Sequence, residues 1–398
     1  MTSRLWILLI CTLSAFTSGS LYSWSALSAP LARFLAQQSG VESLTSSDLS
    51  PAFALASSLT PLTMLISGFL SDRMNPKGIV WFGALAMGTG LYFCALAASP
   101  NDVVLFYGGL FGLGLGLVYG SLINYAVKLY PDRKGFAGGM VTAGYSLGSV
   151  VLPPVVTTLY LDIGIDGVFR LLGVVTAAVI AVGACFMKSV SETGAQVACG
   201  THSSPSNLTG QEMIGTRQFY IVYGFVVVSS VPALTLLSHA DYLSGEIARQ
   251  NAYVLAWLTS IFGIANVFGR MSAGVVSDWA GRKAVLLMSL LMEILGLLLL
   301  MLHAEDCLLF GAVFVLIGCA FGCAMGVIPA WVSDQFGLRY AGLNYGIIIT
   351  GVSVAGILGP MGFLHLEQTL SSRSLTLTSC IAVLFVLAAS VFADKKIR

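Results

Sequence analysis

Apolar residues run along this chain in stretches of about 20 residues, and the short segments between them hold most of the charged side chains. A stretch of that length is what a transmembrane helix needs. We predict twelve such spans, and the chain is therefore expected to be an all-α integral membrane protein. The predicted spans are residues 5–27, 49–70, 78–98, 103–125, 137–160, 168–187, 219–239, 252–276, 284–303, 308–332, 344–365 and 375–393.

One long polar stretch divides the spans into two sets of six. Residues 188–217 are rich in Ser, Thr and Gly and interrupt the apolar pattern. We therefore expect an N-terminal six-helix half at 1–187, a cytoplasmic linker at 188–217 and a C-terminal six-helix half at 218–398.

Composition supports a lipid environment and excludes several functions. Of 398 residues, 57% are hydrophobic and 9% are charged, against about 25% charged in soluble domains. A net charge of +1 offers no electrostatic surface for nucleic acid. The cysteines lie mostly in apolar runs without a C-x-x-C pair, and Cys319 and Cys323 share a helix face as packing residues. The sequence predicts neither a metal site nor a cofactor.

The distribution of cations predicts the orientation. With a cytoplasmic N-terminus, the outside loops hold only Arg33, Arg170, Arg249 and Arg373, whereas most other Lys and Arg residues fall in inside segments. Positive charge favours the cytoplasmic side. Both termini are therefore expected in the cytoplasm, in a multi-pass protein of the cell (plasma or inner) membrane.

The two halves repeat each other. The pattern G-x-x-S-D-x-x-x-x-K occurs at 68–77 and again at 274–283, an offset of 206 residues. The same offset pairs Gly112 with Gly318, Gly116 with Gly322, Gly120 with Gly326 and Pro154 with Pro360. Two parallel six-helix repeats predict a substrate cavity between the halves near the midplane of the membrane.

The repeated loop resembles the signature G-x-x-x-D-R-x-G-R-[RK] of the major facilitator superfamily. Its first copy has Asn75 and Pro76 where the family usually has Gly and Arg, and its second has Trp279 in place of Arg. The resemblance implies the major facilitator fold and a conformational role for this loop. The loop residues are Gly68, Asp72 and Arg73 in the first copy and Gly274, Asp278 and Arg282 in the second.

Further segments resemble one branch, the oxalate:formate antiporter family and the related monocarboxylate transporters. These segments are 21–24, 130–135, 266–270, 344–346, 355–356 and 359–360. The branch implies a small carboxylate substrate, with Arg270 as its anion anchor.

Arg270 is the one cation inside a predicted span. Gly263, Asn266, Arg270 and Gly274 form a small and polar stripe on one helix face. A buried guanidinium needs a partner, and its planar fork of donors matches a carboxylate. The repeat-equivalent position 64 is Met, so the cation is not part of the duplicated loop. The alternative is an Arg that reaches the cytoplasmic interface or binds Asp278.

Other residues are candidates for the cavity wall. Asn266 is expected to hydrogen-bond the substrate or Arg270, and the hydroxyl of Tyr119 is expected to face the substrate across the cavity, with helix packing as the alternative for each. Aromatic and apolar lining is expected from Tyr22, Trp24, Phe321 and Met325, each with a structural role as the alternative. The glycines of spans 5 and 11, with breaks at Pro153, Pro154 and Pro360, would permit bending and sliding.

Glu293 is the one acid well inside a span. An intramembrane carboxyl suggests a proton relay. The alternative is a protonated Glu hydrogen-bonded to a neighbouring helix.

The expected function is secondary transport of small organic anions by alternating access, with a proton or by exchange. Oxalate exchangers of the branch carry a Lys in span 11, whereas residues 347–354 here contain no cation, so a monocarboxylate such as lactate or pyruvate is expected. An exporter of larger amphipathic compounds and a transport-dead sensor are the alternatives. The sequence contains no Walker loop, no H-E-x-x-H and no G-x-S-x-G motif, so we do not expect an enzyme. The sequence does not indicate the oligomeric state.

Overall fold

The computed structural model describes residues 2–39, 44–187, 207–238, 252–302, 307–370, 381 and 383–384. Every regular element in these residues is a helix, which confirms the predicted all-α class. Each of the first eleven predicted spans coincides with helix, and the twelfth, 375–393, lies largely outside the described residues. By length and composition alone, 8 helices within these described residues are long and apolar enough to cross a membrane.

The elements in chain order are α1 (Thr2–Ser18), η1 (Gly19–Ser23), α2 (Trp24–Ser39), η2 (Ser46–Leu49), α3 (Ser50–Ser71), α4 (Pro76–Cys94), α5 (Pro100–Val103), η3 (Val104–Phe111), α6 (Gly112–Leu129), α7 (Lys134–Phe186), α8 (Gly210–Ile214), α9 (Arg217–Ser238), α12 (Ala252–Ala280), α13 (Arg282–Leu302), α14 (Cys307–Phe336) and α15 (Ala341–Leu370).

Helix ends follow the local chemistry of the chain. Asn75 caps α4 because its side-chain oxygen accepts from the backbone N–H of Lys77 at 3.0 Å. Ser99 and Asp102 form a reciprocal capping box at α5. Gly281, with a φ of 89°, separates α12 from α13, and Gly337, with a φ of 92°, follows α14. These left-handed positions suit glycine, which has no Cβ to clash.

The helices group into two units. Unit 1 contains residues 1–131, 144–204 and 339–346, and unit 2 contains 132–143, 205–338 and 347–398. The start of α7 therefore belongs to unit 2 and the start of α15 to unit 1, although their longer parts do not. The division into halves at 187 and 218 stays a prediction.

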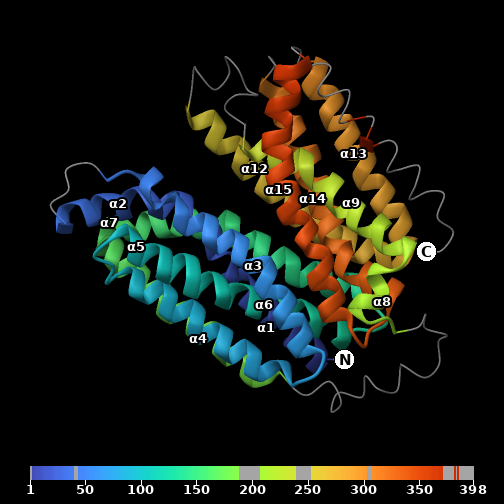
Figure 1. Cartoon of the computed structure of the whole chain (residues 1–398), viewed down its shortest axis with the longest axis horizontal. Helices are drawn as coiled ribbons and strands as arrows, with labels where there is room; N and C mark the ends of the chain where they lie inside the picture. The colour runs from blue at the N-terminus through green and yellow to red at the C-terminus, as the bar shows by residue number, and fades with distance from the viewer. Residues whose placement is uncertain are drawn as a thin grey trace. The chain divides into compact units, whose positions relative to one another are not determined.

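In unit 1, α3, α4 and α6 pack side by side (Figure 1). Close approach depends on the glycines of span 4. A Cβ added at Gly112 would lie 2.7 Å from Cα of Ala56, and one at Gly114 would lie 2.6 Å from the carbonyl oxygen of Gly83. The expected role of these glycines in helix packing is thus visible in α6.

Two irregular helical segments meet inside unit 1. The first span is not a continuous helix, because η1 is a 3-10 segment between α1 and α2. Span 4 begins as a π-helix, η3. The hydroxyl of Tyr107 in η3 donates to the carbonyl of Leu21 in η1 at 3.0 Å. Such irregularities change which side chains face a neighbouring helix.

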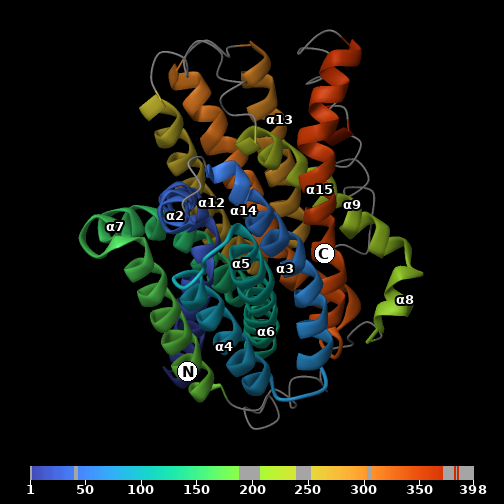
Figure 2. The ribbon, with the colours of Figure 1, turned by 60° about the vertical axis from the view of Figure 1, so that its left-hand side comes forward.

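Helix α7 contains two predicted spans. Figure 2 shows that α7 turns back on itself. Within α7, Gly164 has a φ of 71°, which is not helical. The expected break at Pro153 and Pro154 differs from the structure, because the helix continues through both prolines. A glycine in the left-handed region, rather than proline, makes the turn here.

In unit 2, α12 packs along α14. Glycines on α14 allow the contact: a Cβ at Gly318 would lie 2.8 Å from the carbonyl oxygen of Phe262, and one at Gly326 would lie 2.7 Å from that of Arg270. The polar residues of α12 are therefore held directly against α14.

The predicted linker ends in a short ordered segment. The backbone N–H of Leu208 donates to the carbonyl of Phe336 at 3.0 Å. Thr209 and Glu212 form a capping box at the start of α8, and Met213 is fully buried. Residues 207–217 of the predicted linker thus pack within unit 2, and the bounds of the linker stay a prediction.

Candidate functional site

Arg270 lies where α12 passes Gly326 of α14, and it is 8% exposed. Its Nε–H donates to Oδ1 of Asn266, one turn earlier, at 2.9 Å. Nδ2 of Asn266 donates to the carbonyl of Gly318 at 3.2 Å. Asn266 therefore holds one edge of the guanidinium in place. Within the described residues, the terminal nitrogens of Arg270 have no hydrogen-bond or ion-pair partner.

The structure does not show the alternative contact between Arg270 and Asp278. Asp278 instead binds Arg282 at 2.6 Å and accepts from the backbone N–H groups of Gly135 and Phe136 at 2.9 and 2.7 Å. The burial of Arg270 also differs from that of a side chain that reaches an interface. The guanidinium is thus held by an amide rather than neutralised by a carboxylate.

Three tyrosines form an aromatic group in unit 1, here called the tyrosine cluster: Tyr22, Tyr119 and Tyr145. The rings of Tyr119 and Tyr145 stack with centroids 4.4 Å apart, and Tyr22 meets Tyr145 edge-on at 5.6 Å. Tyr22 is 46% exposed, whereas the other two are buried. Gly19 brings η1 close to α7, since its Cβ would lie 2.8 Å from Cα of Gly148. The cluster thus has one accessible ring, that of Tyr22, which packs against the buried rings of Tyr119 and Tyr145.

The other predicted lining residues have different surroundings. Trp24 is buried, with its ring 4.4 Å from that of Tyr107, which is the packing role named as its alternative. On α14, Phe321 is half-buried and Met325 is buried. Their roles toward a substrate stay predictions.

Glu293 lies in α13 and is completely buried. Neither carboxyl oxygen has a hydrogen-bond partner among the described residues. The alternative in which Glu293 bonds a neighbouring helix is therefore not what the structure shows.

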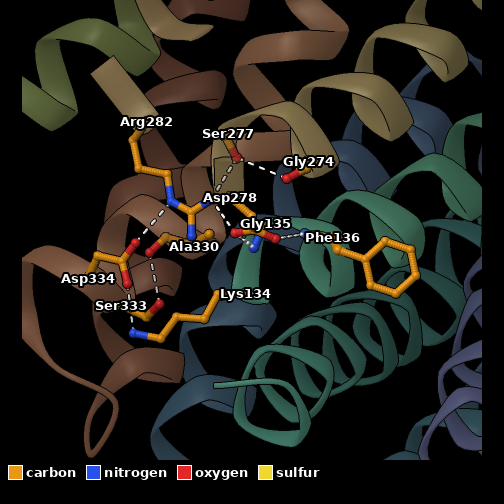
Figure 3. A network of polar contacts seen from close by, with 10 residues as sticks. All are labelled: Lys134, Gly135, Phe136, Gly274, Ser277, Asp278, Arg282, Ala330, Ser333 and Asp334. Carbon is orange, nitrogen blue, oxygen red and sulfur yellow. Dashed lines mark hydrogen bonds and ion pairs between the residues drawn. The ribbon is translucent and has the colours of Figure 1, made fainter. Parts of the chain in front are cut away.

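A charged network surrounds the start of α7 in unit 2 (Figure 3). Besides Asp278, Arg282 binds Asp334 through Nε at 2.9 Å, and Asp334 also binds Lys134 at 2.7 Å. The carboxylate of Asp278 faces the N-terminus of α7, where free N–H groups favour negative charge. Gly274 lies directly against Gly135, which leaves room for this contact.

A smaller network surrounds the start of α15 in unit 1. Asp72 binds Lys128 at 2.5 Å and accepts from Nδ2 of Asn124 at 3.0 Å. It also accepts from the backbone N–H groups of Gly342 and Leu343 at 3.2 and 2.9 Å. Gly68 lies directly against Gly342. Both copies of the repeated loop thus cap a helix start with an aspartate.

Arg73 of the repeated loop does not join this network. Its guanidinium carbon lies 3.8 Å from the centroid of the Phe69 ring. This is a cation–π contact, worth about 1 kcal/mol at an exposed site.

The sequence interpretation missed Lys128, Asp334 and Tyr145. Lys128 and Asp334 are related by the same 206-residue offset as the loop copies, so the repeat could have indicated both. Tyr145 carried no such signal, because its stacking depends on how α6 and α7 pack.

The thiols of Cys319 and Cys323 are hydrogen-bonded to each other. No group of three or more His, Cys, Asp or Glu side chains in the described part of the chain is arranged to hold a metal ion.

Comparison with known proteins agrees with the fold and with the repeat. The model of the Major Facilitator Superfamily matches residues 8–360 and 219–396. The MFS-type transporter YhjX of Escherichia coli (strain K12) is 25% identical over 353 residues, 88% of this chain and 86% of the relative. The oxalate:formate antiporter of Oxalobacter formigenes is 26% identical over 357 residues, 89% of this chain and 81% of the relative.

Monocarboxylate transporters also match this chain, so the resemblance found in the sequence is confirmed. Among solved structures, the human organic anion transporter MFSD10 superposes with a TM-score of 0.73 at 13% identity, covering 98% of this chain and 99% of that one. At this identity the superposition shows the fold alone. The family match spans both six-helix repeats, and the chain belongs to the Major Facilitator Superfamily.

Proposed function

We propose that this transporter carries small monocarboxylates of the lactate or pyruvate kind, with a proton or by exchange, and that Arg270 is the anion anchor. The observation that carries the proposal is the buried guanidinium of Arg270, which Asn266 orients and which no carboxylate of the described residues neutralises. An unneutralised cation at membrane depth costs about 3 kcal/mol or more. A substrate carboxylate would offset that cost.

The chemistry of the anchor favours a carboxylate. Arg presents a planar fork that binds two oxygens at once, and the Nε contact with Asn266 fixes the plane of that fork. Among the described residues, the two terminal nitrogens have no hydrogen-bond or ion-pair partner of their own. A halide or a neutral sugar would use this geometry less well than a carboxylate does.

The site has one identified cation, Arg270, which favours a substrate with one negative charge. Residues 347–354 of α15 contain no Lys or Arg, and Thr350 there shares a hydrogen bond of 3.3 Å with the Tyr223 hydroxyl. A second carboxylate on the substrate would lack a partner, at a cost of several kcal/mol in a medium of low dielectric constant. A monoanion avoids this cost.

The relatives support the substrate class. One relative is named for oxalate and formate, and a structure of the same fold is named for organic anions. We expect the tyrosine cluster to bind the organic part of the substrate, and we expect both termini to lie on the cytoplasmic side of the cell membrane.

The test is counterflow in proteoliposomes. Labelled lactate, pyruvate, formate and oxalate are offered to the parent protein, Arg270→Ala and Arg270→Lys. We expect Arg270→Ala to abolish exchange while melting close to the parent, and Arg270→Lys to lose most of it, because a point charge cannot replace the fork. Arg170→Ala is the matched control, since Arg170 is exposed and its one ion pair within the described residues is with Asp166, four residues earlier.

Normal exchange by Arg270→Ala, or its failure to insert and fold, would contradict the anchor role. Competition at matched concentrations tests the charge argument separately. If oxalate displaces labelled substrate better than lactate or pyruvate does, a second cationic anchor exists and the single-cation argument is wrong.

A further inference from the structure

Glu293 occupies one position in a buried apolar stripe of α13. Its neighbours on the stripe are Leu286, Leu290, Leu297 and Leu300, all of them buried. The spacing of 4, 3, 4 and 3 residues keeps these side chains on one helix face. A leucine at 293 would complete the stripe, so packing gives no reason for a carboxyl there.

The first repeat shows what packing alone selects at this place. Removing the 206-residue offset gives Val80, Ala84, Met87, Leu91 and Cys94, and all five are buried. Met87 is the equivalent of Glu293. One half therefore has an apolar side chain where the other has a buried acid.

Among the residues that the structure describes, no charged side chain is paired with Glu293. On α14, Cys323 lies within electrostatic range, and its thiol is hydrogen-bonded to that of Cys319. Helices α12 and α9 also pack against α13. No side chain of the described residues on these helices forms a hydrogen bond or ion pair with the Glu293 carboxyl.

Protonation removes the cost of burying the Glu293 carboxyl without a counter-ion. An ionised carboxylate without a counter-ion in an apolar interior is strongly disfavoured, whereas the neutral acid costs much less. From its place in the stripe, the contrast with Met87 and the absence of a partner, we propose that Glu293 is the proton-binding group of this transporter. The inference rests on the proposed function, because it names the residue through which a proton accompanies the monocarboxylate.

Helix α14 connects this carboxyl with the anchor. The carbonyl of Gly318 binds Asn266, which orients Arg270. The next residue, Cys319, is a free cysteine whose thiol interacts with that of Cys323, and Cys323 lies within electrostatic range of Glu293. A shift of α14 would therefore disturb the surroundings of both Arg270 and Glu293.

The transport cycle balances in charge. The Glu293 carboxylate takes one proton from the water on one side of the membrane, and Arg270 binds one monoanion. After the conformational change, the carboxyl releases that proton on the other side, and the monoanion leaves. One proton and one monoanion cross together, so net uptake moves no charge against the membrane potential.

The experiment compares exchange with accumulation in proteoliposomes. Glu293→Gln imitates the protonated group, and Glu293→Met inserts the residue of the first repeat. We expect both variants to exchange labelled lactate or pyruvate at equal pH within about threefold of the parent. With a pH gradient imposed, we expect parent accumulation to rise at least tenfold and both variants to show none of this rise. Glu212→Gln, which changes an exposed carboxyl, is the matched control.

The outcomes separate the two proposals. Accumulation by either Glu293 variant at the parent level overturns the role of Glu293, whereas a parent that exchanges no carboxylate overturns the proposed function. Infrared spectroscopy of the purified parent tests Glu293 without substrate. We expect the carbonyl band of a protonated carboxyl that disappears as the pH rises and is missing from Glu293→Met. Spectra identical in the two proteins would overturn the inference.

Discussion

The hydroxyl of Tyr107 donates a 3.0 Å hydrogen bond to the carbonyl of Leu21. The contact joins η1, the 3-10 break in the first span, to η3, the π-helix that begins the fourth. Trp24 lies on the Tyr107 ring at 4.4 Å, directly after the break. The same break contains Tyr22 of the tyrosine cluster, directly after Leu21, so this hydrogen bond helps to fix where the accessible tyrosine lies.

We expect Tyr107→Phe to lower the free energy of unfolding by about 1 kcal/mol. The loss is modest because the Leu21 carbonyl also accepts from the backbone N–H of Trp24. Thermal unfolding in detergent measures the change. Tyr92→Phe is the control, since Tyr92 is 37% exposed and its hydroxyl makes no hydrogen bond within the described residues. Equal melting temperatures for the two variants would show that the contact adds nothing.

The sequence predicts helix positions well because a span is defined by the thickness of the membrane. Arg270 and Glu293 could also be found, since a charge inside an apolar run stands out by itself. The segments η1 and η3 could not be predicted in the same way. The contact of Tyr107 with Leu21 joins them, and the separation of 86 residues along the chain leaves no local pattern that would indicate it.

Asn266→Ala and Tyr119→Phe test the polar contacts next. We expect each to raise the apparent Michaelis constant about tenfold, which corresponds to the loss of about 1 to 2 kcal/mol of hydrogen bonding. In Asn266→Ala the guanidinium of Arg270 loses its orienting acceptor. In Tyr119→Phe the ring still stacks on Tyr145, so only the hydroxyl is removed. Initial rates of uptake across substrate concentrations give the constants, and unchanged values in both would assign these residues to packing.

The capping box of α8 gives a prediction of pH dependence. The backbone N–H and the hydroxyl of Thr209 donate to the carboxylate of Glu212 at 2.8 and 2.9 Å, and these bonds lower its pKa from the ordinary value of 4.5. Because the pKa is lower in the folded segment, the stabilisation is present above pH 4.5 and is lost as the pH falls through the folded value.

Amide hydrogen exchange of residues 209–214, corrected for intrinsic rates, measures the opening of α8. We expect protection to decrease below pH 4.5 in the parent and to stay flat in Glu212→Gln. The same decrease in both proteins would mean that another group controls this segment.

Lys128 and Asp334 hold equivalent positions in the two repeats but carry opposite charges. Lys128 is the one cation in ion-pair contact with Asp72 among the described residues, and the Asp72 side chain is 2% exposed. Asp334 has two cationic partners, Arg282 and Lys134, and its side chain is 36% exposed. Asp72, beside the start of α15, thus depends on Lys128 as its single cationic partner among the described residues. Asp334, beside the start of α7, would keep one cationic partner if the other were removed.

Removal of the two lysines should therefore have unequal effects. We expect Lys128→Met to destabilise the protein by about 3 to 5 kcal/mol, because it leaves the buried carboxylate of Asp72 without a counter-ion. Lys134→Met should cost about 1 kcal/mol or less, since Asp334 is partly solvated and keeps Arg282 at 2.9 Å. The double variant Lys128→Met with Asp72→Asn should recover much of the loss, because the stranded charge is removed with its partner. Unfolding temperatures of the three variants test this prediction. Similar losses of stability in Lys128→Met and Lys134→Met would show that burial of the Asp72 charge does not cause the destabilisation. No recovery of stability in the double variant would show the same.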